Sequence, residues 1–428
     1  MKVAVFEDGR AVNFLPLTYT RAVFDLRLGA YTQLERTVKG LGSVDAVFVR
    51  ELLTAVYRER LKGTAVNPAE ADDDIVFVNS RLVVDSRVAA LVRKRVKDRA
   101  YFAVFEEGDP LLVYAPRSLA DRLCEALAGG ELGTFAKLCR ENLGTLSLSA
   151  TVIGYLWDLI RVNASILSSD VSGLCTGEWE GEVDSRAVIY GDSRVYVARG
   201  AVVEAYAVLD ARGGPIYIGE NTRVGPGAVI KGPAYIGRNS AVTAHALIRS
   251  GSSVGDFCHV GGELKETIIH GYSNKGHTGF MGRAYIGEWV NLGAMTTNSD
   301  LKDTYGTVKV NVGGRRVDTG LTKVGCFIGD MARTSIGTLI YTGKKVGVAS
   351  HLHGIVYEDV PCFTIYAKSL GAEPVELYLE SAIEIQRRMM RRRNKVLTRA
   401  EEELIRRLFE VTEEERRAAG VRRGRFAL

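Results

Sequence analysis

The strongest constraint on the fold of this chain is a six-residue repeat in its middle. An aliphatic residue stands at every sixth position for eight positions in succession, from Ile218 to Val260. A small side chain precedes each of the last seven by two positions, and glycine follows five of the eight. Hexapeptide periods are typical of a parallel β-helix, whose units stack to bury a continuous core. The repeat therefore predicts a left-handed parallel β-helix with the aliphatic side chains in its narrow interior.

The residues before the repeat have a different pattern. Apolar runs at 3–6, 46–49 and 75–78 predict strands, and the stretches 84–98 and 117–128 predict helices. Alternating strands and helices indicate a layered α/β (Rossmann-like) domain with a largely parallel sheet.

Three domains are predicted, because 428 residues are too many for one ordinary core. Residues 1–170 form the α/β domain with a mostly helical connector. Residues 171–365 form the β-helix. Residues 366–428 form a helical basic tail, which would cover the last coil.

Much of the net charge of +5 sits in the tail, where five arginines stand between 387 and 393. A solvated helix face explains them better than nucleic-acid binding, because no aromatic residues interleave with them and glutamates follow. We therefore expect no nucleic-acid partner.

The cysteines and the apolar pattern indicate a cellular location. Six cysteines lack metal-ligand spacing and predict free or buried thiols in a reducing compartment. The first residues run directly into a strand, and no apolar run reaches the roughly 18 residues of a membrane span. These features predict a cytoplasmic protein with no membrane partner.

The repeat breaks twice, and the breaks contain the residues best suited to chemistry. The spacing is 26 from Val260 to Ile286 and 32 from Leu292 to Val324, so loops are expected to leave the β-helix in both intervals. His277, in the first break, has two interpretations. It acts as a general base toward an attacking amine, or it only orders its loop by hydrogen bonding. The other histidines of the repeats, including His259, are predicted to be structural.

Short motifs around His277 resemble the acyltransferase half of the bifunctional UDP-N-acetylglucosamine diphosphorylase / glucosamine-1-phosphate N-acetyltransferase family. They are Gly276-His277, a Tyr-Ile-Gly step at 285–287 and the segment NLGAMT at 291–296. The resemblance implies that His277 is the general base and that Asn298 contacts the acceptor sugar. It also implies that Lys302 or Lys309 contacts the sugar phosphate. Further candidates from the same stretch are the catalytic candidate Lys275 and the substrate-binding candidates Asn274 and Asn291.

The chain is more similar to a variant branch of that family, whose members are described as sugar nucleotidyltransferases. The branch pattern N-x-L-P-L-T-x-T-R-x-x-x-D-x-R-x-G is present at residues 13–29, and the phrase GYSNKGHTGFMG at 271–282. The resemblance covers nearly the whole chain and implies a nucleotidyltransferase-like first domain.

That domain departs from the usual nucleotidyltransferase pattern. Its loop, FEDGRAVNFLPLTYTR, contains one glycine where a phosphate-cradling loop is normally glycine-rich. No carboxylate stands at the usual Mg²⁺ position, where Asn79, Ser80 and Arg81 occur instead, and Asp158 is a candidate metal ligand. The candidate substrate-binding residues of this domain are Arg10, Asn13, Thr18, Arg21, Asp25, Arg27, Asn79 and Arg81.

The resemblance implies two reactions and a homotrimer. The β-helix would acetylate glucosamine-1-phosphate with acetyl-CoA, and the first domain would join N-acetylglucosamine-1-phosphate to UTP with Mg²⁺. Two alternatives remain. One is an enzyme with a single activity, whose β-helix or whose first domain is inactive. The other is a trimer that binds sugar nucleotides without turnover.

Overall fold

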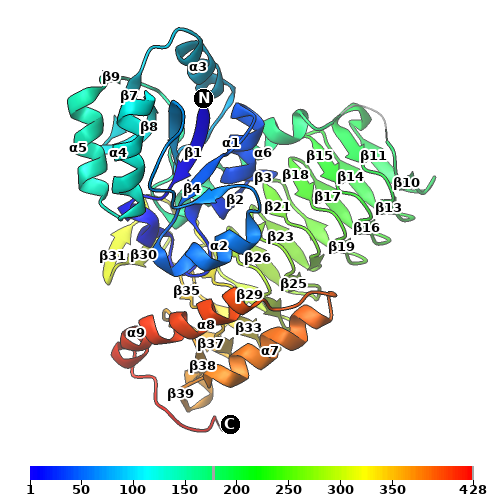
Figure 1. The fold of residues 1–428 in the computed structure, drawn as a ribbon. Helices are drawn as coiled ribbons and strands as arrows, with labels where there is room; N and C mark the ends of the chain where they lie inside the picture. The colour runs from blue at the N-terminus through cyan, green and yellow to red at the C-terminus, as the bar shows by residue number, and fades with distance from the viewer. Residues whose placement is uncertain (176–178, 427–428) are drawn as a thin grey trace.

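The computed structural model describes residues 1–175 and 179–426. Residues 176–178, and residues 427–428 at the end of the predicted tail, lie outside the described part. The chain forms an α/β domain, a long β-helix that projects from it, and a group of helices below both (Figure 1).

The first domain is built on a seven-stranded sheet with the order β5-β4-β1-β6-β8-β7-β9. The first four of these strands are parallel, whereas β8 runs antiparallel to β6 and β7 antiparallel to β8. The strands are β1 Lys2–Phe6, β4 Ala46–Phe48, β5 Ala65–Val66, β6 Ile75–Asn79, β7 Phe102–Glu106, β8 Asp109–Ala115 and β9 Gly144–Leu146.

Helices cover both faces of this sheet and bury one hydrophobic cluster against each. The helices are α1 Gln33–Leu41, α2 Thr54–Arg60, α3 Ser86–Lys97, α4 Arg117–Ala128 and α5 Leu132–Asn142. A sixth helix, α6 Leu156–Ser172, packs instead against the β-helix. A short hairpin, β2 Arg27–Leu28 and β3 Tyr31–Thr32, precedes α1. Helix α1 begins at residue 33 because the Thr32 side chain accepts a hydrogen bond from the Glu35 amide, which forms a capping box. The sheet confirms the predicted α/β fold.

The β-helix has three faces, which we name after their surroundings. The cavity face is the 11-stranded sheet β10-β13-β16-β19-β22-β25-β28-β33-β36-β38-β39. The open face consists of the sheets β11-β14-β17-β20-β23-β26 and β29-β34-β37. The docked face, against the first domain, is β12-β15-β18-β21-β24-β27-β32-β35.

The strands of all three faces are two to five residues long. On the cavity face they are β10 Glu182–Val183, β13 Val202–Val203, β16 Arg223–Val224, β19 Ala241–Val242, β22 His259–Val260, β25 Asn274–Lys275, β28 Asn291–Leu292, β33 Arg333–Thr334, β36 His351–Leu352, β38 Thr364–Ala367 and β39 Ala372–Glu376. On the open face they are β11 Val188–Tyr190, β14 Val208–Asp210, β17 Val229–Lys231, β20 Leu247–Ile248, β23 Glu263–Lys265, β26 Phe280–Gly282, β29 Thr297–Asn298, β34 Leu339–Ile340 and β37 Ile355–Val356. On the docked face they are β12 Val195–Val197, β15 Ile216–Ile218, β18 Ala234–Ile236, β21 Ser252–Val254, β24 Ile268–Ile269, β27 Tyr285–Ile286, β32 Phe327–Ile328 and β35 Lys345–Val346.

The aliphatic positions of the repeat fill the interior of the β-helix, as predicted. All eight, from Ile218 to Val260, are buried in one continuous cluster. Apolar burial of this extent is the main contribution to the stability of a repeat fold, since each coil buries its interior only against its neighbours.

The first break of the repeat is a shortened coil, so the prediction of a loop leaving the β-helix there is wrong. On the cavity face Val242 lies in register with Val260, 18 residues later, whereas Val260 lies in register with Lys275, only 15 residues later. The shortened coil still contributes β23, β24 and β25. The second break does contain an excursion, the hairpin β30 Lys309–Val312 with β31 Arg315–Asp318.

The tail helices pack on the last coils. They are α7 Leu379–Arg391, α8 Arg399–Val411 and α9 Glu413–Ala418. Their apolar side chains share a cluster with Trp289, Met331, Ala349 and Phe363, which occupy successive corners between the docked and cavity faces. The corresponding corners of two earlier coils carry Asn221 and Asn239, and the tail cluster does not include them.

Among the helices of residues 1–175 and 179–426, none is both long and apolar enough to cross a membrane.

Candidate functional site

A cavity of about 580 Å³ lies between the cavity face and α7. Part of its wall is one row of outward side chains on neighbouring strands. His259, Asn274, Asn291 and Arg333 are partners in register on β22, β25, β28 and β33. The cavity therefore brings together Asn274 and Asn291, as the motif suggested, and adds His259. The sequence placed His259 in a regular repeat, and its outward register position is the signal that could have identified it.

His277 reaches the same cavity from the loop that joins β25 to β26. The loop, residues 276–279, turns from the cavity face to the open face and leaves the imidazole exposed. Gly279 has a φ of +131°, and a Cβ at this position would stand 2.2 Å from the carbonyl oxygen of Thr296. Only glycine allows this close approach, so the tight turn beside His277 depends on it.

Lys275 occupies an inward position of the β-helix. Its side chain is buried in register with Val260, and Leu292 follows in the same row. Burial lowers the pKa of Lys275 from 10.5 to about 8. Its ammonium group donates a hydrogen bond to the backbone carbonyl of His277. The candidate catalytic Lys275 thus lies beneath the loop of His277, and it does not line the cavity.

The opposite wall of the cavity is basic. Arg388, Arg392 and Arg393 of the tail line it, and Arg333 adds a further positive charge from the β-helix wall. Arg393 donates to the Asn274 side chain over 2.8 Å, and Arg388 pairs with Glu384. Arg333 has no carboxylate within ion-pair distance among the described residues, and burial lowers its pKa to about 10. Arg388 and Arg392 are exposed, as expected of a solvated face, whereas Arg393 and Arg333 are partly buried, and all four gather around one cavity.

Asn298 is not in this cavity. Its side chain is buried, accepts a hydrogen bond from the Gly282 amide at 2.8 Å and donates to the Gly282 carbonyl at 2.9 Å. It therefore joins β29 to β26, and its amide is fully used within the fold.

A second cavity, of about 570 Å³, lies at the other edge of the open face, beside the hairpin β30–β31. It contains Lys302, the predicted phosphate contact. In the part of the chain that the structure describes, none of its four basic residues forms an ion pair. These are Lys302, Lys309, Arg316 and Lys344, and Tyr305, Tyr341 and Tyr357 stand among them.

Polar residues of the first domain gather at the carboxyl ends of β1 and β6. Asn79 and Arg81 both donate to one oxygen of the buried Asp8, at 2.9 and 2.7 Å. Arg81 also pairs with Glu106, and Arg10 pairs with Glu107 and Asp109. Ligands of open α/β sheets bind at this edge, so Arg10, Asn79 and Arg81 lie where a substrate would be expected. Each guanidinium is already neutralised by carboxylates.

These residues do not fit a magnesium ion. Both oxygens of Asp8 accept hydrogen bonds, from the Arg10 amide and from Asn79 and Arg81. Asp158 caps α6 by accepting from the amides of residues 154 and 155, and it pairs with Arg161. No group of three His, Cys, Asp or Glu side chains among residues 1–175 and 179–426 is placed to hold a metal.

Two further candidates are engaged inside the first domain. Asn13 donates to the Gly154 carbonyl, and the buried Thr18 donates to the Ala11 carbonyl.

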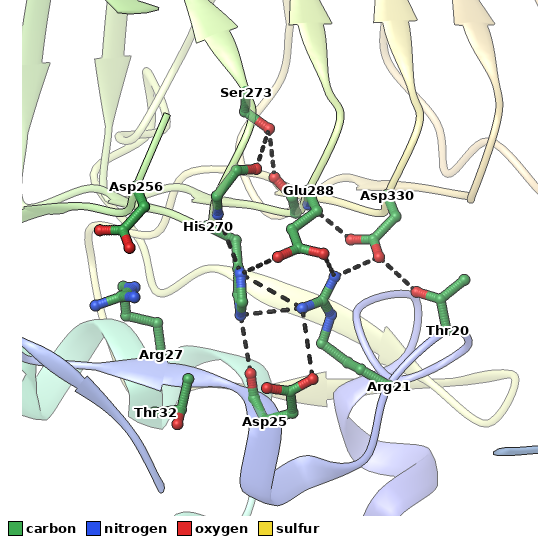
Figure 2. A network of polar contacts seen from close by, with 12 residues as sticks. Thr20, Arg21, Asp25, Arg27, Thr32, Asp256, His270, Ser273, Glu288 and Asp330 are labelled. Atoms are coloured by element: carbon green, nitrogen blue, oxygen red, sulfur yellow. Dashed lines mark hydrogen bonds and ion pairs between the residues drawn. The ribbon is translucent and has the colours of Figure 1, made fainter. Parts of the chain in front are cut away.

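The remaining candidates, Arg21, Asp25 and Arg27, lie between the first domain and the β-helix. Figure 2 shows Arg21 directed into a group formed by His270, Glu288 and Asp330 of the β-helix. The backbone amide of Arg27 donates to the Tyr285 hydroxyl at 2.8 Å. The structure therefore separates this group from Arg10, Asn79 and Arg81.

Two family models match the chain. One, described as "Sugar nucleotidyl transferase", matches residues 3–178, and the other, described as "Bacterial transferase hexapeptide (six repeats)", matches residues 215–250.

Curated relatives match shorter parts. A bifunctional sugar-1-phosphate nucleotidylyltransferase/acetyltransferase of Sulfurisphaera tokodaii is 38% identical over 100 residues, which is 23% of this chain and 25% of the relative. The bifunctional protein GlmU of Gloeobacter violaceus is 33% identical over 123 residues, 28% of this chain and 23% of the relative. The matches thus span about a quarter of the length of each of these relatives.

A third relative is covered further. The uncharacterized acetyltransferase YaiX of Escherichia coli O6:K15:H31 is 34% identical over 161 residues, 37% of this chain and 70% of the relative. Among solved structures, a UDP-N-acetylglucosamine acyltransferase from Campylobacter jejuni is 18% identical with a TM-score of 0.29, over 54% of this chain and 91% of that chain.

Proposed function

Because the chain belongs to the family of bifunctional sugar-1-phosphate nucleotidyltransferases and hexapeptide acetyltransferases, we propose that it is a transferase that makes UDP-N-acetylglucosamine. Its β-helix transfers an acetyl group from acetyl-CoA to the amine of glucosamine-1-phosphate. Its first domain joins N-acetylglucosamine-1-phosphate to UTP and releases pyrophosphate. A cytoplasmic location is part of this proposal.

One observation carries the acetyl transfer: His277 and four arginines line a single cavity. An imidazole is the usual general base at neutral pH. Guanidinium groups without carboxylate partners bind phosphate well, and acetyl-CoA carries phosphates. Arg333, which is partly buried and has no ion-pair partner among the described residues, is the strongest candidate for such a contact.

The reaction that this arrangement supports is a simple acyl transfer. The amine nitrogen attacks the thioester carbonyl carbon, and His277 accepts a proton from the amine. The carbon–sulfur bond then breaks, and coenzyme A leaves as a thiolate that takes up the proton. Asn274 or Asn291 would donate to the developing oxyanion.

The second cavity is proposed to bind the phosphate of the acceptor sugar, through Lys302 and its basic neighbours. The two cavities lie on opposite edges of the open face, so one chain does not join them. That face exposes the apolar side chains Leu339, Tyr341, Ile355 and Tyr357. A homotrimer with the open faces toward its axis would cover them and would bring one cavity of each copy against the other cavity of the next.

The nucleotidyl transfer rests on the family match over residues 3–178 and on the polar group at the ends of β1 and β6. Mg²⁺ would supply charge stabilisation to such a reaction. The residues there do not fit the ion, because both oxygens of Asp8 already accept hydrogen bonds.

The test is acetyl transfer by the purified protein. Acetyl-CoA and glucosamine-1-phosphate are mixed with wild type or His277→Ala, and free coenzyme A is followed. Product from wild type and almost none from the variant supports the proposal. Absence of product from a folded wild type refutes the acetyl transfer and leaves two alternatives, a nucleotidyltransferase whose β-helix is inactive and a trimer that binds sugar nucleotides without turnover. Pyrophosphate release from UTP and N-acetylglucosamine-1-phosphate, titrated with Mg²⁺, tests the first domain separately.

A further inference from the structure

Three corner loops of the β-helix precede the three strands that carry Asn274, Asn291 and Arg333. They are residues 270–273, 287–290 and 329–332, each of which joins a strand of the docked face to a strand of the cavity face. Each loop has four residues, so a displacement at the corner is passed directly to the strand after it. The positions of the three cavity residues therefore depend on these loops.

Arg21 of the first domain contacts all three loops. Its guanidinium lies 3.1 Å from Nε2 of His270 and 3.1 Å from a carboxylate oxygen of Glu288, and it pairs with Asp330. Thr20 adds a hydrogen bond of 2.6 Å to the same carboxylate of Asp330. Figure 2 shows these groups converging from the two domains.

The loops are also linked to one another. Glu288 reaches Nδ1 of His270 at 3.2 Å, and its backbone amide donates to Asp330 at 2.8 Å. The Ser273 hydroxyl donates to the Gly287 carbonyl at 2.7 Å. Arg21 therefore closes a network that already joins the corners in pairs.

The network is largely shielded from water, so its carboxylates depend on the guanidinium of Arg21 as their counter-charge. Only 1% of the Arg21 side chain is exposed. Burial acts to raise the pKa of Glu288, but Arg21 and His270 outweigh burial and hold that pKa well below its usual range. Removing the guanidinium would leave two shielded carboxylates without their cation, a strongly destabilising change in the local structure.

The first domain also holds the other wall of the cavity. Arg60 lies 3.7 Å from Asp25 and 3.2 Å from Glu401 of α8. Helix α8 is in turn joined to α7, the helix that lines the cavity, by the pair Arg387–Glu402. Both walls are thus tied to the segment that contains Arg21 and Asp25.

We propose that Arg21 is a positioning residue for acyl transfer, which sets the positions of Asn274, Asn291 and Arg333 through the three corner loops. It belongs to the segment that sequence resemblance assigns to phosphate binding in the first domain. The kinetic part of this inference rests on the proposed acetyl transfer, whereas its structural part does not.

The experiment compares the full-length protein with Arg21→Gln, Arg21→Lys and Arg36→Gln. Arg36 is the control, because its side chain is also buried, at 8% exposed, and pairs with Asp170 at 2.7 Å, away from the corner loops. Amide hydrogen exchange is measured for the segments 270–275, 287–292 and 329–334, with β16 and β19 as internal references. In Arg21→Gln these segments should exchange at least about fivefold faster than in wild type, and in Arg36→Gln at the wild-type rate.

Kinetics give the second readout. In Arg21→Gln the KM for acetyl-CoA should rise about tenfold, and Arg21→Lys should recover part of the loss. Arg36→Gln should lower the melting temperature without changing KM. If Arg21→Gln leaves exchange in all three segments unchanged, the proposal is overturned, whether or not the protein transfers acetyl groups.

A milder variant covers the case that Arg21→Gln does not fold. Thr20→Val removes only the contact with Asp330, so faster exchange is expected in 329–334 and not in 270–275. An equal change in exchange rate in both segments would contradict the proposal that Arg21 and Thr20 act on each corner loop through its own contact. If the variants show these differences in exchange but wild type transfers no acetyl group, the proposed function is refuted and the structural role of Arg21 stands.

Discussion

The ammonium group of Lys275, inside the β-helix, donates a hydrogen bond to the backbone carbonyl of His277, whose imidazole lies outside it. A cation in a row of aliphatic residues costs stability, since burial disfavours the charged form. Its one hydrogen bond in the structure goes to the residue proposed as the general base. The charge is thus placed where it fixes the loop that carries the base.

Lys275→Met is therefore expected to increase the free energy of unfolding and, at the same time, to slow acetyl transfer. The fall of the Lys275 pKa from 10.5 to about 8 corresponds to roughly 3 kcal/mol, an upper limit for the gain below pH 8. The unfolded chain binds this proton more tightly, so the stability of wild type relative to the variant should rise between pH 8 and 10.5. Denaturant unfolding at several pH values measures this, and kcat for acetyl transfer should fall about tenfold.

Leu292→Met, next in the same row, is the control for Lys275→Met and should change neither quantity much. A Lys275→Met variant with the kcat of wild type would show that the hydrogen bond to His277 has no role in transfer.

The two histidines of the cavity should differ in effect. Loss of a general base costs about 100-fold or more in rate, so His277→Ala should lower kcat to that extent. Burial, and then the charge of Arg393, lower the pKa of His259, which weakens its imidazole as a base. His259→Ala is expected to change kcat less than about tenfold. Steady-state kinetics of both variants measure the two losses of kcat. A larger loss in His259→Ala than in His277→Ala would assign the general base to His259.

Arg333→Met should weaken acetyl-CoA binding and leave the fold intact. A charged hydrogen bond to phosphate is worth about 1.5–3 kcal/mol, so KM for acetyl-CoA should rise at least about tenfold. Because no carboxylate among the described residues pairs with Arg333, its loss leaves no buried charge behind, and the melting temperature should not fall. Arg223→Met is the matched control, on the same face but outside the cavity and paired with Glu204. Equal KM values for both variants would remove Arg333 from the binding site.

Mixed oligomers test whether copies share a site. If His277 of one copy works with Lys302 of the next, His277→Ala and Lys302→Ala are each inactive alone. Trimers that contain both variants should regain about a third of wild-type activity, because one of the three sites in each such trimer would join two intact residues. The measurement is acetyl transfer after co-expression and purification with two tags. Persistent inactivity of a proven mixed trimer would place both residues in one chain.

The sequence was sufficient to predict the β-helix, because the burial of aliphatic side chains dominates its folding. Aliphatic residues from Ile218 to Val260 must all be buried, and one geometry satisfies their spacing. The cavity residues were only partly predictable. His259 differs from its neighbours in no local pattern, and only the register across coils brings it beside Asn274.

Arg21 illustrates a second limit of the sequence. A guanidinium binds phosphate and carboxylate with the same planar geometry, so residue type alone does not distinguish a substrate from Asp330. The same holds for Arg81, which pairs with Asp8. Lys275 was identified, but its inward direction depends on the 15-residue coil, which looks in the sequence like a lost repeat.

The coils from β10 to β14 extend away from both the first domain and the tail helices (Figure 1). Each coil contacts mainly its neighbours, so a whole coil added or removed there would leave both cavities and the corner loops as they are. Each coil would lengthen this arm by roughly 4.8 Å. The number of coils can therefore change without changing the residues of the cavities. The overall length of such a chain accordingly says little about its chemistry.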